Sequence, residues 1–286
     1  MITKNPMQLK AIIKRVAQEK GISAQLVMQN YMLERLLERI AISEYKYNFI
    51  LKGGFLISAI VGLDTRATMD LDTTIKGFDL THEAVREIFS EICSIDINDD
   101  VCFELKGTLD IREADDYPGI RLSLNAKYEK INVPLTVDIT TGDIITPREI
   151  KYTIPFMFDE GSINILAYNI ETILAEKIET ILSRGIANTR TRDFYDIYIL
   201  HVMRWEECNL TTLKEALFRT AEKRNSNKAI QDYLNIITSL KTNKQLHDFW
   251  SKYQRNFDYA KNIAFDDACD TILQIMDDIS RLYKNF

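Results

Sequence analysis

The spacing of apolar residues at the start of the chain predicts two amphipathic helices. Apolar side chains recur at helical intervals over residues 6–20 and again over residues 23–43. We expect Gly21 to stop the first helix and Ser23 to cap the second. The chain therefore begins with a pair of helices joined by a short turn.

Shorter elements follow this helical pair. "YNFILKGG" predicts a strand that ends at two glycines, and the next stretches predict a helix at 55–61, a strand at 69–75 and a helix at 81–94. Strand patterns then dominate to about residue 154, in the runs "VCFELKGTLDI", "GIRLSLNAKY", "LTVDITTGD" and "IKYTIPFMF".

The pattern changes at about residue 160. From there the period is helical, and this part of the sequence holds two glycines and no proline. We therefore predict an α+β fold: residues 1–160 form a mixed β-sheet flanked by helices, and residues 161–286 form a helical C-terminal domain.

The composition excludes some classes of protein. The 286 residues are 46% hydrophobic and 27% charged, which is typical of a folded soluble protein. A net charge of −6 argues against a nucleic-acid coat protein, but not against an enzyme that meets RNA through a local patch. Residues 204–261 carry eleven Lys/Arg against seven Asp/Glu, which suits RNA phosphates, although a generic solvated surface explains the count nearly as well. Residues 262–286 are acidic again.

The sequence also predicts a compartment. The four cysteines have no C-x-x-C spacing, so we expect reduced thiols. The first residues lack the apolar core of a signal peptide, and the uncharged run from Phe55 to Leu63 is too short to cross a bilayer. We expect a cytoplasmic, soluble protein with no membrane partner.

Three aspartates on predicted strands are candidates for metal binding. Asp70 and Asp72 stand two apart, so a strand projects both from one face while Leu71 points to the other. Asp138 alternates with apolar neighbours in the same way in "LTVDIT". If the two strands are neighbours, the three carboxylates form a group that suits one or two Mg²⁺ ions and substrate phosphates. An isolated D-x-D pair can instead be merely solvated.

The adjacent glycines Gly53 and Gly54 add to this interpretation. They follow a predicted strand and precede a predicted helix, where backbone N–H groups can cradle phosphates. A plain tight turn would also explain them. Together with the acid pair, they indicate a nucleotide site.

A lysine interrupts the apolar stripe of the predicted helix "IETILAEKIETILS". Lys177 falls in the middle of the apolar arc formed by Ile173, Leu174, Ile178, Ile181 and Leu182. Its stem can run along the stripe to water. Alternatively, its ammonium group reaches a site and pairs with triphosphate charge.

Two further acids follow in "NTRTRDFYDIYIL". Asp193 and Asp196 share one helix face. Asp193 also fits an ordinary acid in the first turn of a helix, whereas Asp196 lies on a partly apolar face. Arg190 and Arg192 precede the helix and can contact phosphates or pair with these acids.

The order of these motifs resembles a known family. "LKGG", "R-x-T-x-D-x-D", a later strand aspartate, "A-E-K" on a helix and "R-D-x-x-D", with the two lead-in helices, are similar to the AbiEii/AbiGii nucleotidyltransferase-like toxins. That family belongs to the DNA polymerase β-like nucleotidyltransferase superfamily. The resemblance covers about residues 5–200, and the last 85 residues carry no matching motif.

The resemblance implies roles for residues of this chain. It implies a nucleotidyltransferase-like sheet, with Gly53 and Gly54 in a phosphate-binding turn. The implied metal ligands are Asp70, Asp72 and Asp138. The implied catalytic residues are the same three aspartates with Lys177 and Asp193. The residues expected to bind the nucleotide are Lys177, Arg190 and Asp196. Two features depart from the superfamily pattern: Gly-Gly replaces the usual Gly-Ser, and fifteen residues separate Gly54 from Asp70.

The function implied is that of a toxin in a toxin–antitoxin or phage abortive-infection system. Such an enzyme would use Mg²⁺ or Mn²⁺ to transfer NMP from an NTP, either GTP or a pyrimidine NTP, to the 3′ end of tRNA. Transfer to a protein or small molecule is one alternative, and a non-catalytic GTP- or NTP-binding module is another. The implied antitoxin is encoded nearby and need not bind the toxin directly.

Overall fold

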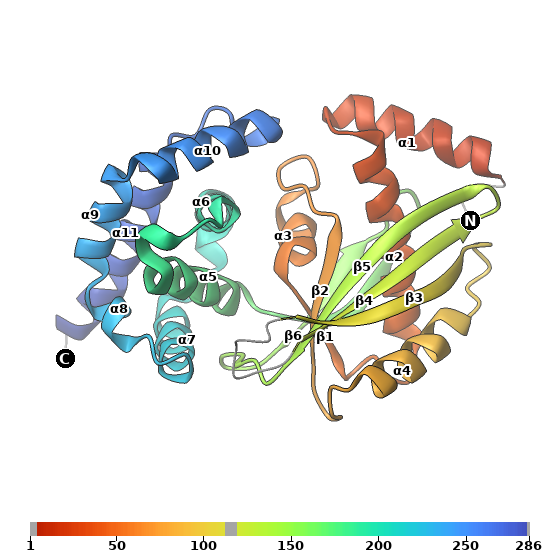
Figure 1. Ribbon diagram of the computed structural model, residues 1–286, viewed down its shortest axis with the longest axis horizontal. Coiled ribbons are helices and arrows are strands. Elements are labelled where there is room, and N and C mark those ends of the chain that lie inside the picture. The colour runs from red at the N-terminus through yellow and green to blue at the C-terminus, as the bar shows by residue number, and fades with distance from the viewer. Residues whose placement is uncertain (1–4, 112–118, 285–286) are drawn as a thin grey trace. The chain divides into compact units, whose positions relative to one another are not determined.

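The computed structural model describes residues 5–111 and 119–284, which form two compact units (Figure 1). Unit 1 comprises residues 1–143 and 150–167, and unit 2 comprises residues 144–149 and 168–286. The chain therefore passes from one unit to the other three times.

Local sequence signals mark the end of the first helix of unit 1 and the start of the second. The hydroxyl of Ser23 accepts a hydrogen bond from the amide of Leu26 at 3.1 Å, and Gly21 caps the first helix with a φ of +64°. Both roles confirm the prediction. The helices are α1 (Pro6–Lys20), α2 (Ala24–Ile42), α3 (Gly53–Val61) and α4 (His82–Ser94).

The described strands form one mixed, seven-stranded sheet in the order β3-β4-β5-β2-β1-β7-β6. Strand β1 runs antiparallel to β2 and parallel to β7, while β2 runs parallel to β5. The strands are β1 (Phe49–Lys52), β2 (Asp70–Ile75), β3 (Cys102–Ile111), β4 (Gly119–Tyr128), β5 (Ile131–Thr141), β6 (Ile150–Pro155) and β7 (Ser162–Ala167).

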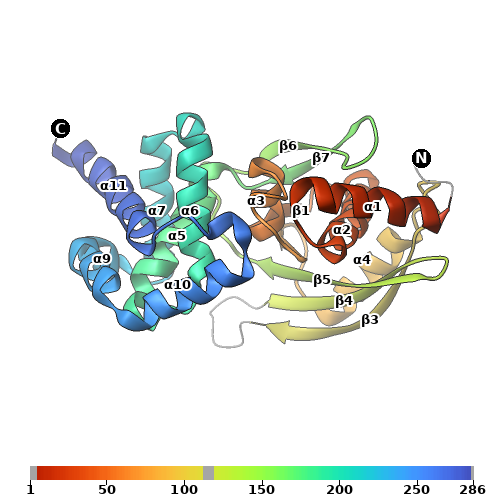
Figure 2. The ribbon, with the colours of Figure 1, turned by 90° about the horizontal axis from the view of Figure 1, so that it is seen from above.

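Alternation along the strands separates the two faces of the sheet. On β4 and β5 the apolar side chains are buried, for example Leu122, Leu124, Val137 and Ile139. Helix α2 packs against β5 and β7, and α4 packs against β3, so these helices cover the apolar face (Figures 1 and 2). The opposite face of β2, β4 and β5 carries the polar side chains.

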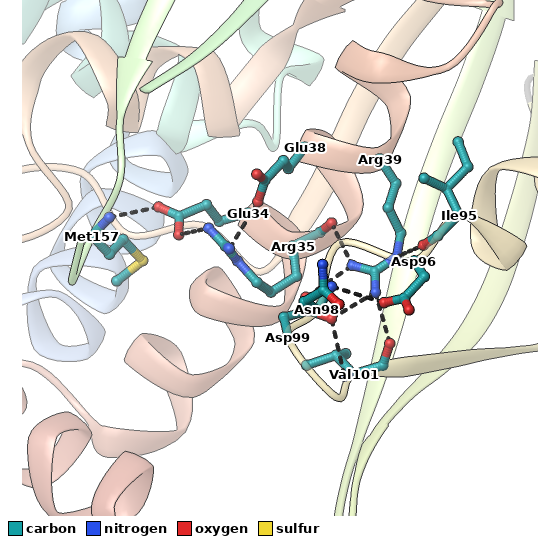
Figure 3. A network of polar contacts seen from close by, with 10 residues as sticks. All are labelled: Glu34, Arg35, Glu38, Arg39, Ile95, Asp96, Asn98, Asp99, Val101 and Met157. Atoms are coloured by element: carbon teal, nitrogen blue, oxygen red, sulfur yellow. Dashed lines mark hydrogen bonds and ion pairs between the residues drawn. The ribbon is translucent and has the colours of Figure 1, made fainter. Parts of the chain in front are cut away.

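Buried charges attach two connecting segments to α2 (Figure 3). The guanidinium of Arg39 donates to both carboxylate oxygens of Asp99, at 2.9 and 2.7 Å, and to the carbonyl of Val101. Glu34 accepts a hydrogen bond from the amide of Met157 at 2.6 Å. Because these groups are buried and satisfied, they hold the loop before β3 and the turn after β6 against the same helix.

Unit 2 is helical, with a core of apolar side chains contributed mainly by its longer helices. Its helices are α5 (Ile170–Arg184), α6 (Thr191–Arg204), α7 (Leu210–Lys223), α8 (Asn227–Gln231), α9 (Tyr233–Thr242), α10 (Lys244–Asn256) and α11 (Phe265–Lys284), with 3-10 turns at Gly185–Ala187, Trp205–Glu207 and Asp258–Ala260. No helix in the described ranges combines the length and apolar character needed to traverse a bilayer. All four cysteines are free thiols.

The structure confirms the α+β fold with a helical C-terminal part, and it differs from the prediction at β7 and at the start of α3. Residues 162–167, expected in the helical part, form strand β7, which pairs with β1 and β6. Ile163, Ile165 and Ala167 alternate inward on this strand. Unit 1 therefore reaches Ala167 rather than residue 160. Helix α3 also begins two residues earlier than expected, at Gly53.

Candidate active site

Four charged residues lie in register across four neighbouring strands of unit 1. Lys52 on β1 pairs with Asp72 on β2, Asp72 pairs with Asp138 on β5, and Asp138 pairs with Arg121 on β4. Partner residues in a sheet project from the same face. We call this set the charged row: a cation at each end and two carboxylates between them. Asp70 projects from the same face of β2 as Asp72. Because β2 pairs with β5, the condition for the three carboxylates to share one face is met.

The glycine turn lies directly beside this row. Helix α3 starts at Gly53 immediately after β1, and Gly53 has a φ of +65°. A Cβ at this position would overlap the carboxylate of Asp72. The amide of Gly54 donates a hydrogen bond to Oδ2 of Asp72 at 3.2 Å. The glycine pair and the D-x-D pair therefore meet, while contact of the glycines with a phosphate stays a prediction.

The surroundings of Gly54 explain why no serine stands there. A Cβ at Gly54 would lie 2.7 Å from Oγ1 of Thr68 and 3.1 Å from Nη2 of Arg66. Both side chains are buried. The segment before β2 thus fills the space that a side chain at position 54 would need, so local packing favours glycine at position 54.

Asp138 is held by an arginine that the sequence did not single out. Nε and Nη2 of Arg121 donate to Oδ1 and Oδ2 of Asp138, both at 2.7 Å. The hydrogen bonds to Asp138 and its charge raise the pKa of Arg121, and the charges of Asp70 and Asp72 add to this effect. The Arg121 side chain is 45% exposed and that of Asp138 is 17% exposed.

The carboxylates fit a divalent metal only in part. Within residues 5–111 and 119–284, no three His, Cys, Asp or Glu side chains are arranged so that they could hold a metal ion together. Asp70 and Asp72 still supply the hard oxygen ligands that Mg²⁺ takes, one or two carboxylates being enough when substrate phosphates complete the shell. The role of Asp138 as a third ligand stays a prediction, because its carboxylate is engaged by Arg121.

Lys52 is a second cation that the sequence analysis missed. Its side chain is buried; Nζ donates to Oγ1 of Thr140 at 2.6 Å and forms an ion pair with Asp143. The sequence did hold a signal for Lys52, because this lysine ends an apolar strand and directly precedes the two glycines. Arg121 gave no local signal, because an arginine on the outer face of a strand is ordinary.

In unit 2, Lys177 pairs with both late acids. Its Nζ lies 2.8 Å from Oδ1 of Asp193 and 2.7 Å from Oδ2 of Asp196, and its side chain is 13% exposed. Burial disfavours the charged amine, but the two carboxylates outweigh it and raise the pKa of Lys177. The placement of Lys177 on the buried face is confirmed, and its role toward a nucleotide stays a prediction.

Arg190 completes this cluster at the start of α6. Its Nε donates to Oδ2 of Asp193 at 2.6 Å, and Asp193 lies in the first turn of the helix. Burial raises the pKa of Asp193, but the charges of Lys177 and Arg190 and their hydrogen bonds lower it to about 2. The structure thus brings together Lys177, Arg190, Asp193 and Asp196, with two cations and two carboxylates.

Comparisons with solved structures agree with this architecture. MenT4, a nucleotidyltransferase toxin from Mycobacterium tuberculosis, matches with a TM-score of 0.56 and 11% identity over 94% of this chain and 98% of that one. JHP933 from Helicobacter pylori matches with a TM-score of 0.51 and 15% identity over 92% and 97%. At these identities the likeness shows the fold alone. No curated protein matches the chain closely enough to count as a relative.

A family model decides the relationship. The model described as "Nucleotidyl transferase AbiEii toxin, Type IV TA system" matches residues 35–271, which include every candidate residue above. The structure independently joins the glycine turn to the D-x-D pair in unit 1, and the lysine to the late acids in unit 2. The chain belongs to the AbiEii family of nucleotidyl transferase toxins of type IV toxin–antitoxin systems.

Proposed function

We propose that this protein transfers a nucleoside monophosphate from an NTP to the 3′ end of tRNA. The observation that carries the proposal is the contact between the Gly53–Gly54 turn and Asp72, with Asp70 on the same sheet face. Membership in the family implies an NTP substrate, a divalent metal and an antitoxin partner. The nucleotide, the acceptor and the metal are the finer parts of the proposal.

The reaction forms one bond to phosphorus, and the acceptor hydroxyl gives up its proton. The hydroxyl oxygen bonds to the α-phosphorus while its proton passes to solvent, the α–β phosphoanhydride breaks, and pyrophosphate leaves. Asp70 and Asp72 would hold Mg²⁺ or Mn²⁺, which supplies neutralisation of the charge on the phosphates. Backbone amides at the start of α3 would bind phosphate oxygens, as helix N-termini do.

The remaining candidate residues bind rather than react in this proposal. Lys177 and Arg190 would contribute cationic charge toward the nucleotide, with Asp193 and Asp196 holding them in position. GTP or a pyrimidine NTP is the proposed donor. The eleven Lys/Arg against seven Asp/Glu in residues 204–261 favour an RNA acceptor.

Membership in a toxin family supports a proposal for the biological setting. We infer that the protein acts in the cytoplasm as a toxin, including in defence against phage by abortive infection. An antitoxin encoded nearby would restrain it, without any need for direct binding.

The test is transfer of label. Purified protein is incubated with Mg²⁺ and each α-labelled NTP, with total tRNA or cell protein as acceptor. Label in tRNA that is lost in Asp70→Ala, but kept in the surface control Asp79→Asn, supports the proposal. Label in protein rather than in tRNA would indicate that the acceptor is a protein. NTP binding without any transfer of label would indicate a non-catalytic binding module.

A further inference from the structure

The Arg121–Asp138 pair has a geometry that an anionic substrate can take over. Two of the five N–H donors of the Arg121 guanidinium, one on Nε and one on Nη2, are used in the hydrogen bonds to the two oxygens of Asp138. A phosphate presents oxygens to a guanidinium in the same forked manner as a carboxylate. A phosphate can therefore bind Arg121 together with Asp138, or it can replace Asp138 as the partner of Arg121.

The two cations of the charged row differ in their exposure to solvent. Lys52 is buried and is held by Thr140 and Asp143, whereas the side chain of Arg121 is 45% exposed. Asp70, Asp72 and Asp138 together place more negative than positive charge on this part of the sheet. A nucleotide that approaches these carboxylates needs an accessible cation, and in the charged row this is Arg121.

We propose that Arg121 binds a phosphate of the nucleotide, and that Asp138 is the counter-ion of Arg121 while the site is free. When the phosphate takes the guanidinium, the carboxylate of Asp138 is released and becomes available as a metal ligand. This rests on the proposed function, since it names a residue that recognises the NTP. It also accounts for the lack of a three-carboxylate metal group among the described residues.

The first experiment measures nucleotide affinity without metal. A non-hydrolysable GTP analogue and the corresponding analogues of CTP and UTP are titrated in EDTA, by calorimetry, into the wild type, Arg121→Gln and Arg121→Lys. We expect Arg121→Gln to weaken binding about tenfold or more, because a charge-assisted hydrogen bond is lost. Arg121→Lys keeps the charge without the fork and should fall between the two.

The matched control is Lys127→Gln. Lys127 lies on the same strand, β4, is 49% exposed, and pairs with Glu104 at 2.6 Å, away from the charged row. Lys127→Gln also removes an exposed positive charge from β4 and breaks a cross-strand ion pair. The control should bind the analogues as the wild type does.

The second experiment uses Mn²⁺ alone, followed by electron paramagnetic resonance. Arg121→Gln frees Asp138 without nucleotide, so it should bind Mn²⁺ several-fold more tightly than the wild type, and Arg121→Gln/Asp138→Asn should lose that gain. Thermal unfolding of each variant, with Arg121→Lys as the milder change, identifies any loss of fold.

The outcomes separate this inference from the proposed function. If the wild type binds the analogues and Arg121→Gln binds them equally well, Arg121 is no phosphate ligand and the inference fails while the function stands. Unchanged Mn²⁺ affinity in folded Arg121→Gln overturns the release of Asp138. If the wild type binds no NTP with or without metal and transfers no label, the proposed function itself is wrong.

Discussion

The backbone amide of Gly54 donates a hydrogen bond to the carboxylate of Asp72, which lies eighteen residues later in the sequence. A carboxylate at the N-terminus of α3 occupies a position that favours negative charge. The first turn of α3 and the D-x-D strand are therefore structurally coupled, and a substitution in either should disturb the conformation of the other.

Substitution of Gly53 by alanine tests how closely the turn approaches Asp72. Gly53 and Gly21 have nearly equal positive φ values, +65° and +64°, but a Cβ at Gly53 overlaps Asp72 while a Cβ at Gly21 meets nothing within 4 Å. We expect Gly21→Ala to cost about 1 kcal/mol of unfolding free energy. Gly53→Ala should cost about 2–4 kcal/mol, because overlap adds to the backbone strain. Urea unfolding of both variants measures the difference, and equal costs would contradict the close approach.

The packing at Gly54 predicts a coupled pair of substitutions. Gly54→Ser should lower stability by about 1–3 kcal/mol, because its Cβ would lie 2.7 Å from Oγ1 of Thr68. Thr68→Ala removes that atom and should recover part of the loss, which a double-mutant cycle reports as a coupling energy. Gly107→Ser, where a Cβ meets nothing within 4 Å, is the control. Additive effects of the two changes would argue against the steric explanation.

Local sequence patterns predicted most elements and the main candidate residues. The period-two alternation of β2 and β5 identified the common face of Asp70 and Asp72, and the matching orientation of Asp138. Whether the three carboxylates lie side by side depends on the parallel pairing of β2 with β5. Local sequence patterns do not predict which strands pair, so this pairing could only be assumed.

What the sequence analysis missed depends on contacts between distant segments. Arg121 becomes important because the antiparallel register of β4 and β5 sets it opposite Asp138. Lys52 becomes important because its long side chain reaches Thr140, 88 residues away. Strand β7 is short, and its three inward residues were too few to outweigh the helical pattern that follows.

Substitution of Lys177 should destabilise unit 2 strongly. Lys177→Met leaves Asp193 and Asp196 buried with less positive charge, and breaking one side of a buried ion-pair cluster costs about 3–5 kcal/mol. Lys241→Met removes an exposed pair with Asp270 and should cost at most about 1 kcal/mol. Chemical unfolding compares the two. A small loss in Lys177→Met would show that the cluster contributes little to stability.

Acid should weaken the same cluster. The pKa of Asp193 in the folded protein is about 2, below the ordinary value of 3.8 for an aspartate, so its stabilisation is complete above about pH 4 and is lost as the pH falls through 2. The loss amounts to roughly 2 kcal/mol by linkage. Unfolding free energies at pH 5, 3 and 2 measure it in the wild type. Asp193→Asn should show a smaller loss over this range, and an unchanged pH dependence would contradict the assignment.

The three passages of the chain between the units restrict how this protein can be rearranged. Residues 144–149 belong to unit 2, where the carbonyl of Thr146 accepts a hydrogen bond from the side chain of Asn169, yet strands β6 and β7 follow them in unit 1. No single cut in the polypeptide separates the two units without leaving part of one behind. A recombination event with one crossover cannot exchange either unit cleanly, so the D-x-D sheet and the lysine helix are expected to be inherited together.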